Sequence, residues 1–295
     1  MPNQLPRNLH SRILRRLSVS LRKLISAALL TMFCAGATAA ETSYSIAIVP
    51  QYPPAEIHRD WTPLLERIRL ETGINLTLSI AASIPAFEVG LFSGEPDFAY
   101  MNPYHEVMAM RAKGYLPLVR DSTPLSGILM VRKDDPITSV KQLDGKEIAF
   151  PAPNAFGASL WMRALLAERE KIHITPLYVK THSNAYRYVV TGKAVACGGV
   201  NHTLSEEPAE VRDSLRVLLE TPGVPSHPLS AHPRVPEPVR RKLAEFLLSL
   251  PEMAGGPALL KGVQMASPVR ADYARDYRPL EKYGLDNYVV RATAP

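Results

Sequence analysis

The sequence predicts an α/β protein of two lobes, each a mostly parallel sheet flanked by helices. Short apolar strands alternate with amphipathic helices along two separate stretches of the chain. A strand with no helix before it divides the stretches, and a proline-rich segment follows the second one. Two crossings between the lobes would form hinges on either side of a cleft.

The first series of elements fills residues 43–113. A strand at 44–49 precedes a helix that should begin at Thr62-Pro63, a hydroxyl cap before a proline, and end at Gly73. The order then repeats as strand 75–80, helix 85–92, strand 97–100 and helix 103–113. Such alternation predicts parallel strands.

The second series begins at strand 126–132 and continues as strand 147–150, helix 155–170, strand 177–179, helix 184–191 and strand 194–197. Six prolines between 221 and 238 indicate a second crossing, after which helix 237–250 and the last turns return to the first lobe. The predicted organisation is a signal peptide at 1–40, the first lobe at 41–125, the second at 126–222, and the return crossing with the rest of the first lobe at 223–295.

The first forty residues are typical of a secretory signal peptide. They hold six basic residues and no acid, then an apolar run from Leu24 to Phe33, then Ala37-Thr-Ala-Ala40. The run is shorter than the ~20 residues that span a bilayer. We expect cleavage after Ala39 or Ala40, with Cys34 leaving unlipidated.

Charge and cysteine content exclude several classes of protein. The chain has 34 basic and 28 acidic residues, and losing the six basic residues of the signal leaves it near neutral. A nucleic-acid partner is therefore not expected. Cys197 alone forms no disulfide within the mature chain and is predicted to be a core residue.

Three polar junctions between a strand and a helix point to a small ligand. They are Phe98–Tyr104, with Tyr100 and Asn102; Pro151–Ser159, with Asn154; and Thr181–Asn184, with His182 and Ser183. Backbone N–H groups are free at the start of a helix, and α/β domains bind ligands at such strand ends.

These segments resemble the phosphate, phosphite and phosphonate solute-binding family of ABC importers, within the type II periplasmic binding proteins. The likeness covers about residues 43–281. It rests on Trp61-Thr-Pro-Leu-Leu-Glu66, on Asp97-Phe-Ala-Tyr-Met-Asn-Pro-Tyr104, on Val131-Arg-Lys-Asp-Asp-Pro-Ile137 and on Thr181-His182.

The resemblance implies ligand contacts residue by residue. The aromatic residue of the first loop falls at Tyr52 or Gln51, the segment tyrosine at Tyr100, and the histidine at His182. The remaining candidates are Asn102, Asn154, Ser159, Ser183 and Asn201.

Two departures from the family pattern weaken phosphonate as the ligand. The helix start Asn154-Ala-Phe-Gly-Ala158 is apolar where phosphonate binders carry hydroxyls, and Asn201 stands where an acid is expected. A monoanion or a partly apolar ligand, with Asn154 capping the helix, suits this sequence better, and alkylphosphonates should bind weakly.

The resemblance implies a monomeric periplasmic protein that delivers a small, anionic ligand to an ABC permease without a cofactor or metal. The alternative is a sensing module read by a membrane sensor kinase, and an enzyme on this fold is third. Tyr100 and Tyr104 could instead be core aromatics, and Asn102 only a helix cap. His227 and His232 lack metal-ligand spacing, and no Gly-x-Ser-x-Gly motif supports a Ser159 or Ser126 triad with His182.

Overall fold

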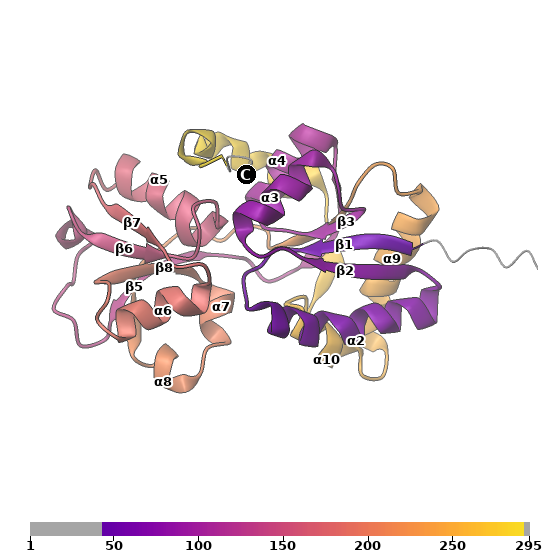
Figure 1. Ribbon diagram of the computed structural model, residues 1–295, viewed down its shortest axis with the longest axis horizontal. Coiled ribbons are helices and arrows are strands. Elements are labelled where there is room, and N and C mark those ends of the chain that lie inside the picture. Colours follow the sequence, from indigo (N-terminus) through magenta and orange to yellow (C-terminus); the bar gives the residue numbers. More distant parts are fainter. Residues whose placement is uncertain (1–42, 292–295) are drawn as a thin grey trace, which may run out of the picture. The chain divides into compact units, whose positions relative to one another are not determined.

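The computed structural model describes residues 43–291, and these form two mixed sheets flanked by helices (Figure 1). The first sheet has six strands in the order β11-β4-β10-β3-β1-β2, and the second has five in the order β7-β6-β8-β5-β9. We call the parts built on these sheets lobe 1 and lobe 2. The predicted two-lobe fold is confirmed, while the signal peptide lies outside the described residues.

The strands are β1 Ser43–Ile48, β2 Asn75–Ile80, β3 Phe98–Tyr100, β4 Leu116–Asp121, β5 Gly127–Arg132, β6 Glu147–Phe150, β7 Thr175–Tyr178, β8 Ala196–Val200, β9 Leu215–Glu220, β10 Pro228–Ala231 and β11 Pro268–Arg270. The α-helices are α2 Pro54–Thr72, α3 Ile84–Ser93, α4 Pro103–Lys113, α5 Trp161–Glu168, α6 His182–Val190, α7 Asn201–Ser205, α8 Ala209–Arg212, α9 Glu237–Ser249 and α10 Gly256–Gly262. The remaining short helices are labelled η. The 3₁₀-helices are η1 Val140–Leu143, η3 Leu250–Glu252, η5 Arg278–Tyr283 and η6 Leu285–Tyr288, and the π-helices are η2 Phe156–Leu160 and η4 Tyr273–Tyr277. None of the helices described is long and apolar enough to cross a membrane.

The prediction of mostly parallel sheets is wrong. β1 pairs in parallel with β2 and β3, and β6 with β7 and β8. The pairs of β10, β11, β5 and β9 are all antiparallel. The reason is that chain segments next to the crossings themselves join the sheets. β10 forms inside the proline-rich segment because Pro228 is its first residue, a place where a missing N–H is tolerated.

The predicted start of the first helix is also wrong. α2 begins at Pro54, and Pro63 lies inside it. The buried face of α2 runs from Ile57 to Ile68 and continues past Pro63, which is exposed. The carbonyl left without an N–H partner there can therefore bond to water. The predicted end is confirmed, because Gly73 has a φ of 70° and its N–H bonds to the Arg69 carbonyl oxygen at 2.9 Å.

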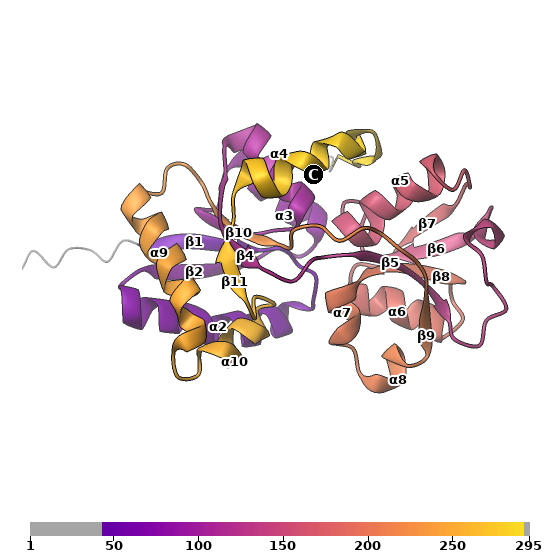
Figure 2. The ribbon, with the colours of Figure 1, turned by 180° about the vertical axis from the view of Figure 1, so that it is seen from behind.

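The two crossings between the lobes run side by side (Figure 2). Leu125 and Val224 form an antiparallel bridge with N···O distances of 2.8 and 2.9 Å. Asn201 supports the bridge from lobe 2, since its Oδ1 accepts from Ser126 N at 3.2 Å and its Nδ2 donates to the Pro124 carbonyl at 3.0 Å. The crossings are thus tied together where lobe 2 begins.

Glycines let the start of the η2–α5 helix approach the sheet of lobe 2 closely. A Cβ atom on Gly198 would lie 1.9 Å from the carbonyl oxygen of Ala158 and 2.6 Å from the Phe150 ring. A Cβ on Gly127 would lie 2.2 Å from the carbonyl oxygen of Gly157. These backbone contacts fix the height of the helix above β5 and β8.

We predict that Gly198→Ala lowers the free energy of unfolding by about 1–3 kcal/mol, because the new methyl group overlaps a backbone carbonyl that cannot move alone. Urea unfolding followed by circular dichroism measures it. Gly262→Ala is the matched control, since its Cβ would meet nothing closer than 3.9 Å. Equal stability of the two variants would contradict the proposed close approach.

Candidate ligand-binding site

A small cavity lies between the lobes, beside the crossings, and we call it the inner cavity. Its volume is about 10 Å³, about enough for one water molecule. The lining residues are Val49, Gln51, Ile84, Asn102, Leu125, Ala155, Phe156, Gly157, Ala158, His182, Val200 and His227. None of these lining residues is a lysine, arginine, aspartate or glutamate.

The N-terminus of the η2–α5 helix faces the inner cavity. Ser159 N and Leu160 N both bond to the Ala155 carbonyl, at 2.7 and 3.1 Å. The backbone N–H groups of Phe156, Gly157 and Ala158 donate no hydrogen bond to any residue that the structure describes. Three free donors and the positive end of the helix dipole therefore meet at the cavity.

His182 reaches the same cavity from the start of α6, where Thr181 caps the helix. Its side chain is 3% exposed. Nδ1 shares a hydrogen bond of 3.2 Å with Thr203 Oγ1, and Nε2 has no partner within residues 43–291. Burial lowers the pKa of His182 to about 4, so the imidazole is neutral at pH 7.

His227 also lines the inner cavity, although the sequence suggested it only as a candidate metal ligand. It precedes β10, so the unexpected strand brings it to the cavity. Its ring stacks on Tyr100, with centroids 5.6 Å apart, and makes no hydrogen bond among the described residues. Burial, together with the neighbouring histidines His202, His105 and His182, lowers its pKa well below the usual value. The signal in the sequence was only its closeness to an apolar segment.

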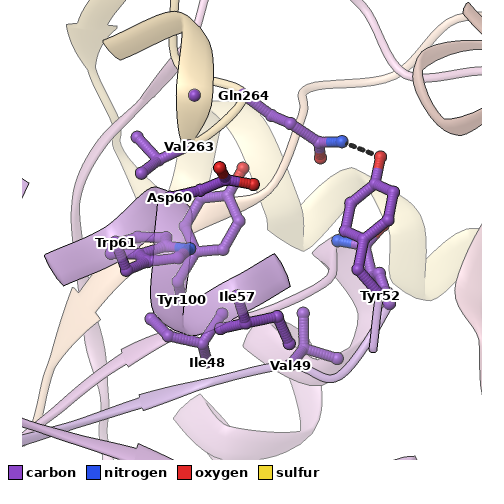
Figure 3. Close-up of a pocket in the computed structure, with 11 residues that line it drawn as sticks. Ile48, Val49, Tyr52, Ile57, Asp60, Trp61, Tyr100, Val263 and Gln264 are labelled. Atoms are coloured by element: carbon purple, nitrogen blue, oxygen red, sulfur yellow. Dashed lines mark hydrogen bonds between the residues drawn. The ribbon is translucent and has the colours of Figure 1, made fainter. Parts of the chain in front are cut away.

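A second small cavity, of about 20 Å³, lies on the lobe 1 side (Figure 3). We call it the aromatic cavity, because Tyr52, Trp61 and Tyr100 line it. The Tyr100 ring packs 5.1 Å from the Trp61 ring, and burial raises the pKa of its hydroxyl. Val49 and Gln51 line both cavities, so the two are adjacent.

The Tyr100 hydroxyl and the Gln51 amide have no hydrogen-bond partner in the part of the chain that the structure describes. Both side chains are buried, at 4% and 6% exposed. Tyr52 differs, because its hydroxyl accepts a hydrogen bond from Gln264 Nε2 (Figure 3). Gln51 was the alternative to Tyr52 in the first loop, and it is the one that reaches the inner cavity.

Asn102 and Asn154 use their side chains within the protein. Asn102 Oδ1 caps α4 by accepting from His105 N at 2.7 Å, and its Nδ2 donates to the Asn154 carbonyl at 3.2 Å, across the lobes. Asn154 binds Glu88 and Val290 instead of capping a helix; the cap position is Ala155. The predicted helix cap at Asn154 is therefore wrong.

The remaining three predicted residues lie away from the inner cavity. Ser159 is fully buried, and its Oγ accepts a hydrogen bond from Arg163 Nε at 3.3 Å. Ser183 donates to Glu207 and lines a polar outer cleft of about 590 Å³. Asn201 supports the crossings, as described above.

The outer cleft adjoins the aromatic cavity. Both spaces are lined by Tyr52, Asp60, Gly262 and Gln264. The hydrogen-bonded side chains of Tyr52 and Gln264 therefore border both the outer cleft and the aromatic cavity.

Comparison with known proteins agrees with this arrangement. The family model for the phosphonate periplasmic substrate-binding protein of ABC transporters matches residues 46–277. This chain belongs to that family. The family consists of binding proteins that serve ABC transporters, and the predicted resemblance is confirmed. By sequence, the chain matches no curated protein.

Solved structures show the same fold at low identity. PhnD1 from Prochlorococcus marinus, in complex with methylphosphonate, is 12% identical with a TM-score of 0.76, over 84% of this chain and 99% of that one. A binding protein of a Pseudomonas aeruginosa ABC phosphonate transporter is 14% identical with a TM-score of 0.74, over 86% and 90%. A Xanthomonas citri protein bound to chloride is 18% identical with a TM-score of 0.70, over 84% and 99%.

We predict that the contribution of His182 to stability falls as the pH drops from 6.5 to 4. The unfolded chain binds a proton at the usual histidine pKa near 6.5, whereas folded His182 resists protonation down to about 4. Protons therefore favour the unfolded state within this window. His182 alone accounts for a loss of about 3 kcal/mol at its lower end.

Urea unfolding at several pH values tests this prediction. His182→Gln should reduce the dependence of the unfolding free energy on pH by about 1.4 kcal/mol per pH unit. His58→Gln is the control, because His58 is exposed on α2. A pH dependence that is the same in both variants would show that His182 is accessible to protons in the folded state.

Proposed function

We propose that this protein captures a small anionic solute in the cleft between its lobes and delivers it to an ABC permease. The observation that carries the proposal is the set of polar groups that converge on the inner cavity, which must widen beyond about 10 Å³ to admit a solute. Three free backbone N–H groups, from Phe156 to Ala158, meet the side chains of Gln51 and His227 there, together with Nε2 of His182. These groups face one space and are free to hydrogen-bond, so their convergence favours a ligand that bonds to several of them at once.

The electrostatics of the cavity favour a monoanion over a dianion. No guanidinium or ammonium group lines it, and burial keeps both histidines neutral. Neutral donors and a helix N-terminus match about one negative charge, whereas a dianion loses more hydration on entering. We therefore propose that simple alkylphosphonates bind weakly, although they suit other members of the family.

Contacts of the candidate nucleophiles support binding without catalysis. Ser159 Oγ accepts from Arg163, and Ser126 Oγ donates to Glu220, so neither hydroxyl is bonded to an imidazole. Within residues 43–291 no cluster of histidine, cysteine and carboxylate side chains could hold a metal ion.

We propose a monomer in the periplasm, with the signal removed near Ala40.

A thermal-shift screen of oxyanions, sulfonates, carboxylates and phosphonates on the mature protein tests the proposal. We predict that a monoanion gives the largest shift. Titration calorimetry with that compound should show His182→Ala weakened by about 10–100-fold, the effect of leaving a ligand oxygen unpaired. Tyr100→Phe should weaken binding similarly if the ligand also fills the aromatic cavity.

Tyr44→Phe is the matched control, since the Tyr44 ring contacts Phe98 and lines neither cavity, so the change should leave affinity unchanged. Submicromolar binding of methylphosphonate would contradict the proposed preference for monoanions. Normal affinity in His182→Ala would contradict the placement of the ligand in the inner cavity.

A further inference from the structure

The last turns of the chain run from lobe 1 onto lobe 2 (Figures 1 and 2). We call residues 278–291 the C-terminal strap. On lobe 1 the strap is held by Asp286, whose Oδ1 accepts a hydrogen bond from Tyr104 at 2.8 Å. Arg111 binds the same carboxylate at 3.1 and 3.2 Å. The strap is therefore anchored to α4.

On lobe 2 the strap binds the helix whose N-terminus faces the inner cavity. The Tyr283 ring lies 4.6 Å from the Trp161 ring. Arg163 Nη2 donates to the Tyr288 carbonyl at 2.8 Å, and the Tyr288 hydroxyl donates to Glu168 at 2.6 Å. These contacts span α5 from its first residue to its last.

Asn154 joins the strap to both lobes. Its Oδ1 accepts from Val290 N at 3.0 Å, and its Nδ2 donates to the Val290 carbonyl at 2.8 Å and to Glu88 Oε2 at 3.0 Å. The other Glu88 oxygen binds His105 Nε2 at 2.8 Å. Asn154, Glu88 and His105 are all buried, so each depends on the others for its hydrogen bonds.

We propose that the C-terminal strap, fastened at Asn154, holds the two lobes closed before any ligand binds. Opening the cleft must break the bonds from Asn154 to Glu88 and to Asn102, both of which cross between the lobes. Both bonds are exchanged for bonds to water, and the bond to the Glu88 carboxylate is the stronger one lost. Such a cost favours the closed form, independently of what occupies the cavity.

The strap is also short between its anchor on lobe 1 and its anchor on lobe 2. Only three residues separate Asp286, fixed to lobe 1, from Val290, fixed to lobe 2. A fully extended chain spans about 3.3–3.6 Å per residue, so these anchors can separate to no more than ~14 Å. A wider opening requires the strap to leave one lobe. Ligand access is then governed by how often the strap releases.

The sharpest test compares Val290→Pro with Val290→Ala. Proline removes the N–H that binds Asn154 Oδ1, whereas alanine keeps it, and both changes replace the same half-exposed side chain. Val289, with φ of −66° and ψ of 126°, already has a conformation that tolerates a following proline. Neither substitution lies in the core.

Trp161 reports the release of the strap. It is buried against Tyr283, and Trp61→Phe makes it the single tryptophan of the mature chain. In ligand-free protein, Val290→Pro should increase the population of the open form. The acrylamide quenching constant of Trp161 should then rise about twofold or more. The radius of gyration measured by small-angle scattering should also increase. Val290→Ala should match the parent.

Asn154→Ala should reproduce the effect of Val290→Pro, with Asn287→Ala as its control, since Asn287 is an exposed strap residue. Circular dichroism establishes that each variant is folded. Quenching and radius equal to the parent in both Val290→Pro and Asn154→Ala would overturn the proposal. No ligand enters the experiment, so the result is independent of the proposed function.

Discussion

The contact between the start of the η2–α5 helix and the glycines of lobe 2 is the constraint on which the binding site depends. The Gly157 and Ala158 carbonyls lie where Cβ atoms of Gly127 and Gly198 would otherwise be. Because the carbonyls point toward the sheet, the N–H groups of the same turn are left for the cleft. The helix thus supplies donors through its backbone, which explains how Ala155, Phe156 and Ala158 line the proposed anion site without a hydroxyl.

Neutral polar groups complete this site, and their neutrality has a consequence for binding. His182 and His227 stay uncharged because burial penalises the imidazolium form. An anion held beside them would favour the charged form and raise both pKa values. Binding and protonation are then linked, so a bound anion recovers part of the stability lost to acid.

The sequence predicted the junctions at Asn102 and Thr181, because a capping residue after an apolar run is a local signal. The end of the first helix at Gly73 is also a local signal, whereas its start at Pro54 was missed. His182 was found at its junction for the same reason. By contrast, β10 and His227 depend on pairing between segments more than a hundred residues apart, such as Ser230 with Ala99. The roles of Asn154 and Asn201 were missed because an asparagine that bonds to distant backbone has no distinguishing sequence pattern.

The strap and the inner cavity act on opposite parts of one helix. The free N–H groups stand at its first turn, while Trp161, Arg163 and Glu168 carry the strap further along. A ligand at the first turn and the strap on the side both stabilise the same closed arrangement, so each should strengthen the other's hold by an equal free energy. A strap that favours the closed form too strongly would slow access to the cavity. A strap that favours it too weakly would lower affinity, because ligand binding alone would have to supply the free energy of closure. The short segment between Asp286 and Val290 therefore affects both how fast a ligand enters and how tightly it is held, although this segment lies outside the cavity.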